Sequence, residues 1–184
     1  MPQGAVLSTT SFALYISDMP HPPHTLLALY ADDTAIIAQS WRTDTIAHRL
    51  SHAMSMLLRS FSKWKLQVNI HKTEAILFTR RRLIAPAPLR SHRSIAPWMS
   101  QVRYLVLTLD SKLLFTEHIT SVTHKATDTL LQLFPLLAPD STLNTHNKIT
   151  LYKLFIRSAL TYAATVWSYI SPSTYHRLQV LQSK

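Results

Sequence analysis

The 184-residue chain contains a single glycine, Gly4. Because soluble proteins average about 7% glycine, this scarcity excludes collagen-like repeats and glycine-rich linkers. It also excludes the glycine-rich loops that cradle phosphates in dinucleotide-binding and P-loop proteins, since those loops need several glycines at fixed spacing. The chain has no cysteine, so disulfides, thiolate zinc sites and cysteine nucleophiles are excluded too. Any site must therefore be built from other residue types.

Positive charge is concentrated in the middle of the chain. The net charge is +10; residues 1–40 hold three aspartates and no lysine or arginine, whereas residues 41–103 hold twelve basic and two acidic residues. Such an excess usually serves a polyanion or a membrane surface. We find no uninterrupted apolar stretch of roughly 18 residues and no basic start typical of a secretory signal. We therefore expect an intracellular protein, nuclear or cytoplasmic, that is not secreted and does not enter a membrane.

Apolar periodicity divides the chain into a mixed half and a helical half. In the first half it predicts a weak helix over 5–18 and a second helix from Thr43-Asp44, as N-cap, to Trp64. It predicts hairpin strands over 26–31 and 34–38 and further strands over 68–70, 75–79 and 102–109. A loop is predicted over 83–100. In the second half it predicts helices over 119–137 and 149–163 and a third that begins at Ser171-Pro172-Ser173. This is an α+β pattern.

Asp32 and Asp33 separate the two apolar runs of the predicted hairpin. Because strand side chains alternate, we expect Tyr30 and Asp32 on one face and Asp33 on the other. Carboxylates are the ligands that Mg²⁺ prefers, and two ions about 3.5–4 Å apart are the usual clamp for phosphoryl displacement, which needs carboxylates from more than one strand. Adjacent aspartates are also common turn formers, and the residues alone leave that alternative open.

The hairpin and its flanks resemble the reverse transcriptase of non-LTR (LINE-type) retrotransposons, particularly the jockey-like branch. The resemblance rests on blocks that follow the family's order: Pro2-Gln3-Gly4 with Leu14-Tyr15-Ile16-Ser17-Asp18, Tyr30-Ala31-Asp32-Asp33, Lys63-Trp64 to Phe78, Val102-Arg103-Tyr104-Leu105, His118-Ile119 with Lys125-Ala126, and Leu151-Tyr152-Lys153 with Val166-Trp167. One tetrapeptide is a weak signal, but six blocks in order over nearly the whole chain are a strong one.

The resemblance implies a partial polymerase palm over residues 1–110, with an antiparallel sheet that carries the catalytic hairpin. An all-helical thumb and connecting region would follow over residues 111–184. The implied activity is that of an RNA-directed DNA polymerase, a nucleotidyltransferase of a mobile element. In such an enzyme a primer 3′ hydroxyl attacks a deoxynucleoside triphosphate at its α-phosphate under two Mg²⁺ ions, with RNA as template. RNA template, DNA primer and deoxynucleoside triphosphates would be its partners.

The resemblance also implies roles for individual residues. Asp32 would be a direct metal ligand, and Asp33 would be its neighbour in the acidic, metal-binding site. Tyr30 would pack beside the incoming nucleotide and the primer end. Gln3 and Gly4 would contact template and nucleotide.

Lys72 is similar to a lysine that lies near the leaving pyrophosphate in many polymerases. A cation or proton donor there would stabilise developing negative charge. The alternative for a single lysine after a predicted strand is a solvated charge with no catalytic role.

Three positions depart from the family pattern. The family usually has serine where Ala5 stands, proline where Thr9 stands and glycine where Val106 stands. Val106 matters most, because a β-branched residue does not tolerate the positive φ that glycine permits. The chain also begins at the Pro-Gln-Gly block, so the family's fingers and the palm strand with a further metal-binding aspartate would lie upstream. We therefore expect an incomplete two-metal site and a fragment that is inactive alone.

Two other functions stay open from the sequence. One is a non-catalytic nucleic-acid-binding remnant of a retrotransposon, held to RNA or DNA by the basic segment. The other is a degenerate product without function. The run Arg80-Arg81-Arg82 would suit a phosphate backbone or a nuclear address, although three arginines after a strand are also typical of a solvated edge.

Overall fold

The computed structural model describes residues 10–11, 14, 17–81, 86–91 and 94–182. Two compact units make up the chain: Met1–Leu77 with Arg82–Met99, and Phe78–Arg81 with Ser100–Lys184. Helices and small two-stranded sheets are both present, as the α+β class predicts. The assignment of residues 1–110 to a palm and 111–184 to a thumb remains a prediction. Most of the helix expected over 5–18 lies outside the described residues.

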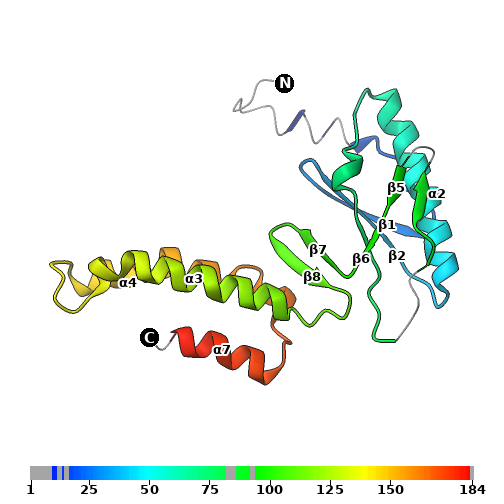
Figure 1. The fold of residues 1–184 in the computed structure, drawn as a ribbon. Coiled ribbons are helices and arrows are strands. Elements are labelled where there is room, and N and C mark those ends of the chain that lie inside the picture. Colours follow the sequence, from blue (N-terminus) through cyan, green and yellow to red (C-terminus); the bar gives the residue numbers. More distant parts are fainter. Residues whose placement is uncertain (1–9, 12–13, 15–16, 82–85, 92–93, 183–184) are drawn as a thin grey trace. The chain divides into compact units, whose positions relative to one another are not determined.

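Strands β1 (Thr25–Tyr30) and β2 (Asp33–Ala38) form the antiparallel hairpin that the two apolar runs predict (Figure 1). The turn lies one residue earlier than expected, because Ala31 and Asp32 form it and Asp33 opens β2 opposite Tyr30. Ala31 has a φ of 49°, as the first position of a primed two-residue turn requires. The predicted faces were therefore wrong: Tyr30 shares its face with Asp33, its cross-strand partner.

Helix α2 (Thr43–Lys63) confirms the strongest helical pattern of the first half and packs against β1 and β2. Ala53 and Leu57, on its apolar stripe, are buried. The predicted N-cap was wrong. Arg42 occupies that position without a side-chain hydrogen bond, and Asp44 lies in the first turn, where a carboxylate still interacts favourably with the helix dipole.

The remainder of the first unit differs from the prediction. A 3₁₀ helix, η1 (Ile70–Lys72), replaces the strand expected over 68–70, and only β3 (Ala75–Ile76) forms within 75–79. The expected loop over 83–100 contains three short strands, β4 (Leu89–Ser91), β5 (Ser94–Ala96) and β6 (Trp98–Met99). β4 pairs with β5, and β6 pairs in parallel with β3. Pairings of two or three residues leave no periodic signal in a sequence.

The second unit contains a hairpin of β7 (Gln101–Tyr104) and β8 (Leu107–Asp110), where the sequence predicts strand over 102–109. Leu105 and Val106 form the turn with φ values of 46° and 71°. Positive φ at both turn positions is the type I′ pattern, which favours Asn-Gly. The tyrosyl hydroxyl of Tyr162 donates to the carbonyl of Leu105 at 3.3 Å and ties this turn to the helices.

Asp110 connects the hairpin to the first long helix of this unit, α3 (Thr116–Leu137). Its carboxylate accepts hydrogen bonds from the backbone N–H groups of Lys112, Leu114 and Phe115, at 3.0, 3.1 and 2.7 Å. Leu113 and Phe115 both have positive φ. A charged acceptor shared by three amides therefore stabilises a loop that no glycine relaxes.

Four further helical elements and a π-helical segment complete the unit: α4 (Thr145–Leu151), η2 (Tyr152–Arg157), α5 (Ser158–Thr161), α6 (Ala164–Trp167) and α7 (Pro172–Gln182). Helical backbone runs without interruption from Thr145 to Thr161, so the helix expected over 149–163 is confirmed for most of its length, with a π-helical segment inside it. Ile149 and Phe155 of its predicted stripe are about half exposed. The third predicted helix is confirmed as α7, with Pro172 at its first position.

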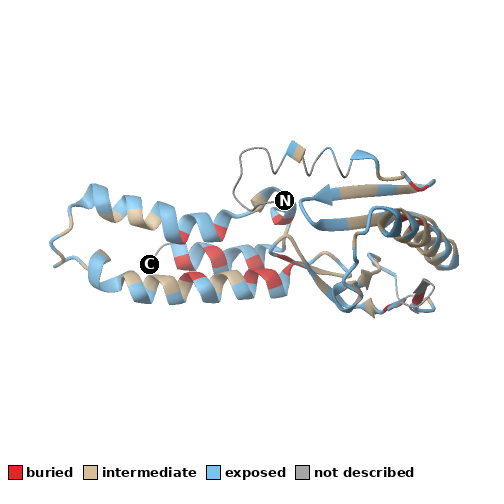
Figure 2. Cartoon of the chain, turned by 90° about the horizontal axis from the view of Figure 1, so that it is seen from above, coloured by how far each residue is buried: buried red, intermediate tan, exposed pale blue. Residues whose placement is uncertain are grey.

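The core of the second unit lies between α3 and the helices that pack on it, η2, α5 and α7. Figure 2 shows buried positions along the facing sides of these helices. The buried members are Leu107, Phe115, Ile119, Ala126, Ile156, Leu160, Trp167, Leu178 and Leu181. Ile119 and Ala126 come from the stripe predicted over 119–137, which is confirmed as α3.

Positive φ angles recur at non-glycine residues throughout the described chain: His24, Ala31, Lys65, Leu105, Val106, Leu113, Phe115 and Ala163. Each such position costs an L-residue roughly 1–2 kcal/mol. Turns that glycine would relax are therefore held by local hydrogen bonds and packing. Among the described residues, no helix is long and apolar enough to span a bilayer.

Candidate functional site

The acidic tip of the β1–β2 hairpin is the candidate site. Asp32 and Asp33 are exposed, and within the described part of the chain neither carboxylate accepts a hydrogen bond or forms an ion pair. Tyr30, which pairs with Asp33 across the hairpin, exposes 63% of its surface. Two free carboxylates and an aromatic ring therefore face solvent at one end of the sheet.

The donor chemistry of this tip fits a hard divalent cation. Mg²⁺ is usually held by one or two carboxylates, and substrate phosphates and waters complete its shell. The described residues contain no group of three acidic or histidine side chains that would hold an ion without such help. Asp32 and Asp33 therefore suit a site that substrate completes rather than a closed structural metal site.

Lys72 lies on a segment that shares a cavity with this hairpin. It ends η1 and is exposed, and no ion pair within the described residues joins it to either aspartate. Thr73, the next residue, and Thr34, which follows Asp33, line the same apolar cavity of about 100 Å³ between α2 and the hairpin. The structure thus brings the segments of Lys72 and the two aspartates together around one cavity. Gln3 and Gly4 lie outside the described residues.

The family model described as reverse transcriptase (RNA-dependent DNA polymerase) matches residues 1–109, more than half of the chain. The chain belongs to the reverse transcriptase family. The match includes the hairpin, its acidic tip and the segment of Lys72. The resemblance that the sequence blocks predict is therefore confirmed.

The curated relatives of this reverse transcriptase chain carry the names of mobile-element enzymes. All of the chain aligns at 31% identity with the probable RNA-directed DNA polymerase from transposon BS of Drosophila melanogaster. It aligns at 29% with the RNA-directed DNA polymerase from mobile element jockey, and at 28% with the probable RNA-directed DNA polymerase from transposon X-element, both from the same fly. The chain spans 21% of the length of each relative. No solved structure matches it significantly.

Sequence reasoning missed two residues of this reverse transcriptase chain, Asp110 and His118, that accept backbone hydrogen bonds around the start of α3. Asp110 holds the loop before α3, and an aspartate that begins an Asp-Ser-Lys turn is the signal that would have identified it. His118 is 4% exposed, and the backbone N–H of Thr108 donates to its Nδ1 at 3.5 Å. Burial, and secondarily the charge of Lys125, lowers the pKa of His118.

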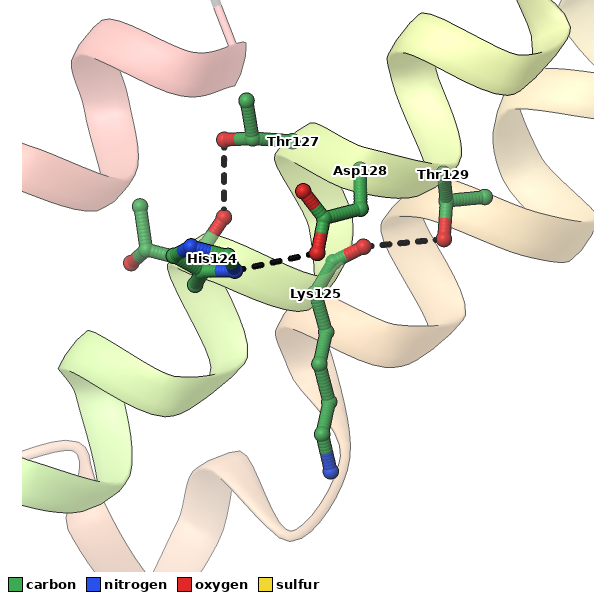
Figure 3. Close-up of polar contacts among 6 residues, drawn as sticks. His124, Lys125, Thr127, Asp128 and Thr129 are labelled. Carbon is green, nitrogen blue, oxygen red and sulfur yellow. Dashed lines mark hydrogen bonds and ion pairs between the residues drawn. The ribbon is translucent and has the colours of Figure 1, made fainter.

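On the solvent-facing side of α3, polar side chains form hydrogen bonds within the helix (Figure 3). Nδ1 of His124 and Oδ2 of Asp128 are hydrogen-bonded at 3.0 Å, and the hydroxyl of Thr129 donates to the carbonyl of Lys125. Figure 3 shows the side chain of Lys125 extending away from these contacts. Residues one turn apart on a helix commonly pair in this way, so the His124–Asp128 contact indicates local stabilisation rather than a site.

Proposed function

We propose that this chain is the part of an RNA-directed DNA polymerase of a jockey-like mobile element that carries the catalytic hairpin of the palm and the helical thumb. Residues 1–110 would form the end of the palm and residues 111–184 the thumb and connecting region. The observation that carries the proposal is the exposed Asp32–Asp33 tip within a chain of the reverse transcriptase family. The names of the relatives support the same activity.

In this proposal Asp32 and Asp33 hold Mg²⁺ through their free carboxylates. When bound, Mg²⁺ supplies neutralising charge for the phosphate oxygens of an incoming deoxynucleotide and lowers the pKa of a primer hydroxyl. Two ions need a carboxylate from another strand as well, and the described residues group none with these two. We infer that the active polymerase includes further residues, and that the 184-residue chain does not polymerise by itself.

The other residues of the tip would position the substrates. Tyr30 presents an exposed ring beside Asp33, where it can pack against the sugar or base of a nucleotide. Lys72, on the segment that shares a cavity with the hairpin, would offer its ammonium to the leaving pyrophosphate. Gln3 and Gly4 would contact the template. RNA template, DNA primer and deoxynucleoside triphosphates are the proposed partners.

Metal binding by the tip can be tested on the 184-residue chain itself. Substoichiometric Mn²⁺ is expected to broaden the backbone amide NMR signals of residues 30–34 by paramagnetic relaxation. Asp32→Asn should remove this broadening, because an amide is a much weaker ligand for a hard cation than a carboxylate. Asp140→Asn, at an exposed turn of the second unit, removes the same charge and should leave it unchanged. Broadening that persists in Asp32→Asn would contradict the assignment.

A non-catalytic nucleic-acid-binding remnant is the alternative, and the net charge of +10 favours it. It predicts RNA binding that weakens steeply with salt and does not depend on Asp32. The polymerase proposal predicts in addition that nucleotide incorporation by a longer protein that contains this chain requires Asp32. The two functions are therefore separable by one substitution.

A further inference from the structure

A hollow of about 440 Å³ lies in the second unit and is lined by residues of that unit alone. Arg80 and Lys112 line it, together with the ring of Tyr169 and the apolar side chains of Leu113, Leu114 and Ile170. We call it the Arg80–Lys112 pocket. Its size falls within the range of sites that hold small organic ligands, about 300–1,000 Å³.

Contacts within the unit fix the walls of this pocket. The backbone N–H of Thr79 donates to the carbonyl of Ser111 at 2.9 Å, which holds Arg80 beside Lys112 although 32 positions separate them in sequence. The carboxylate of Asp110 accepts a hydrogen bond from the N–H of Lys112 at 3.0 Å and orders that loop. Tyr169 packs edge-on against buried Phe115, with ring centroids 6.0 Å apart.

The charged groups of the pocket are both cations. No acidic side chain lines it, and within the described residues neither the guanidinium of Arg80 nor the ammonium of Lys112 has a hydrogen bond or ion pair. The nearest carboxylate in sequence, that of Asp110, is already shared by three backbone amides. A pocket lined by two cations and no carboxylate attracts an anion.

The remaining wall selects among anions. Leu113, Leu114 and Ile170 are apolar, and Tyr169 offers an aromatic face. A bare phosphate or sulfate would leave this wall unused, whereas a nucleotide combines a phosphate with a flat, weakly polar base. Base stacking on aromatic side chains is a general and sequence-tolerant contact, and arginine is suited to bidentate phosphate binding.

We propose that the Arg80–Lys112 pocket binds one nucleotide unit, with its phosphate against Arg80 and Lys112 and its base against Tyr169. The unit belongs either to a nucleic-acid strand or to a free nucleotide, which share this chemistry. The pocket contains none of the residues assigned to polymerisation, so the inference stands whether or not Asp32 and Asp33 bind a metal.

The test uses the folded 184-residue chain and two probes, a fluorescein-labelled oligo(dT) strand followed by anisotropy and dTMP followed by calorimetry. Arg80→Gln with Lys112→Gln removes both cations of the pocket. Lys153→Gln with Arg157→Gln is the matched control, because both residues are exposed on η2, outside the pocket, and carry the same total charge. Circular dichroism confirms that each variant is folded.

The pocket variant should weaken oligo(dT) binding at least about 10-fold more than the control. It should also lower the slope of log K against log salt by about 0.7, since the one phosphate held by both cations contributes about 0.7 for single strands. Tyr169→Leu should weaken binding about 10-fold without changing that slope. Loss of oligo(dT) binding without measurable dTMP binding would identify a strand as the source, and parallel loss of dTMP binding would identify the free nucleotide. Equal effects of the pocket and control variants on both probes would overturn the proposal.

Discussion

Replacing Val106 with glycine should stabilise the protein, although it removes an apolar side chain. Val106 is the second turn residue of the β7–β8 hairpin and has a φ of 71°. The left-handed region costs an L-residue roughly 1–2 kcal/mol, and a β-branched residue lies at the upper end of that range. Glycine removes this cost but brings back about 0.5–1 kcal/mol of chain entropy. Since Val106 is 57% exposed, lost burial subtracts only about 0.5 kcal/mol.

The net expectation is a gain of about 0.5–1 kcal/mol, which corresponds to a Tm rise of about 1–4 °C for a chain of this size. Differential scanning calorimetry on the 184-residue chain measures it. Val102→Gly is the matched control, because Val102 lies in β7 of the same hairpin, is partly buried and does not have a positive φ. That substitution should lower the Tm. If Val106→Gly lowered the Tm as much as Val102→Gly does, the strain at this turn would be refuted.

Three other perturbations test the organisation of the second unit and the role of the hairpin. Asp110→Ala leaves three backbone amides without their charged acceptor and should lower the free energy of unfolding by about 2–3 kcal/mol in urea titrations, whereas exposed Asp140→Ala should change it little. Burial lowers the pKa of His118, so the unfolded chain binds a proton at this residue more readily than the folded chain does. The stability contributed by neutral, buried His118 is therefore complete above about pH 6.5 and is lost as the pH falls below it. Urea midpoints at pH 8 and pH 5 should differ less in His118→Gln than in the unsubstituted chain. Lys72→Gln should slow nucleotide incorporation by a longer protein that contains this chain. It should leave the Mn²⁺-induced broadening of the amide NMR signals of residues 30–34 intact. A loss of both incorporation and broadening would assign Lys72 to the structure of the metal site instead.

Long periodic patterns in the sequence predicted the long elements. Apolar residues at helical spacing gave α2 and α3, and two apolar runs around an aspartate pair gave the β1–β2 hairpin. The turn was misplaced by one residue because Ala31 takes the positive φ that its own side chain disfavours. Nothing in a local pattern indicates that choice, since it depends on the pairing of Tyr30 with Asp33.

Elements held by short or distant pairings could not be predicted. β3 consists of two residues and pairs with β6 more than twenty positions later, so neither strand has a period of its own. The π-helical segment η2 interrupts the stripe over 149–163 and leaves Phe155 exposed. A change of helical pitch arises from tertiary packing and has no composition signal.

The candidate site shows the same division. Asp32 and Asp33 were found because adjacent carboxylates between apolar strands carry a chemical meaning and a family pattern. Arg80 and Lys112 line one pocket where the backbone of Thr79 is hydrogen-bonded to that of Ser111. In the sequence Arg80 belongs to a basic run, and Lys112 is a single charge in a loop. A site assembled from separate loops needs the fold before it can be recognised.

The most direct test of the central claim is single-nucleotide primer extension on an RNA template, with protein made from the longest open reading frame that encodes this chain. Incorporation should depend on Mg²⁺ and should fall at least about 100-fold in Asp32→Asn, because loss of a metal ligand should cost no less than loss of its outer-shell support. Asp140→Asn should retain full activity. No incorporation by the unsubstituted protein, or equal incorporation by Asp32→Asn, would contradict the assignment of the β1–β2 hairpin as the catalytic centre of a polymerase.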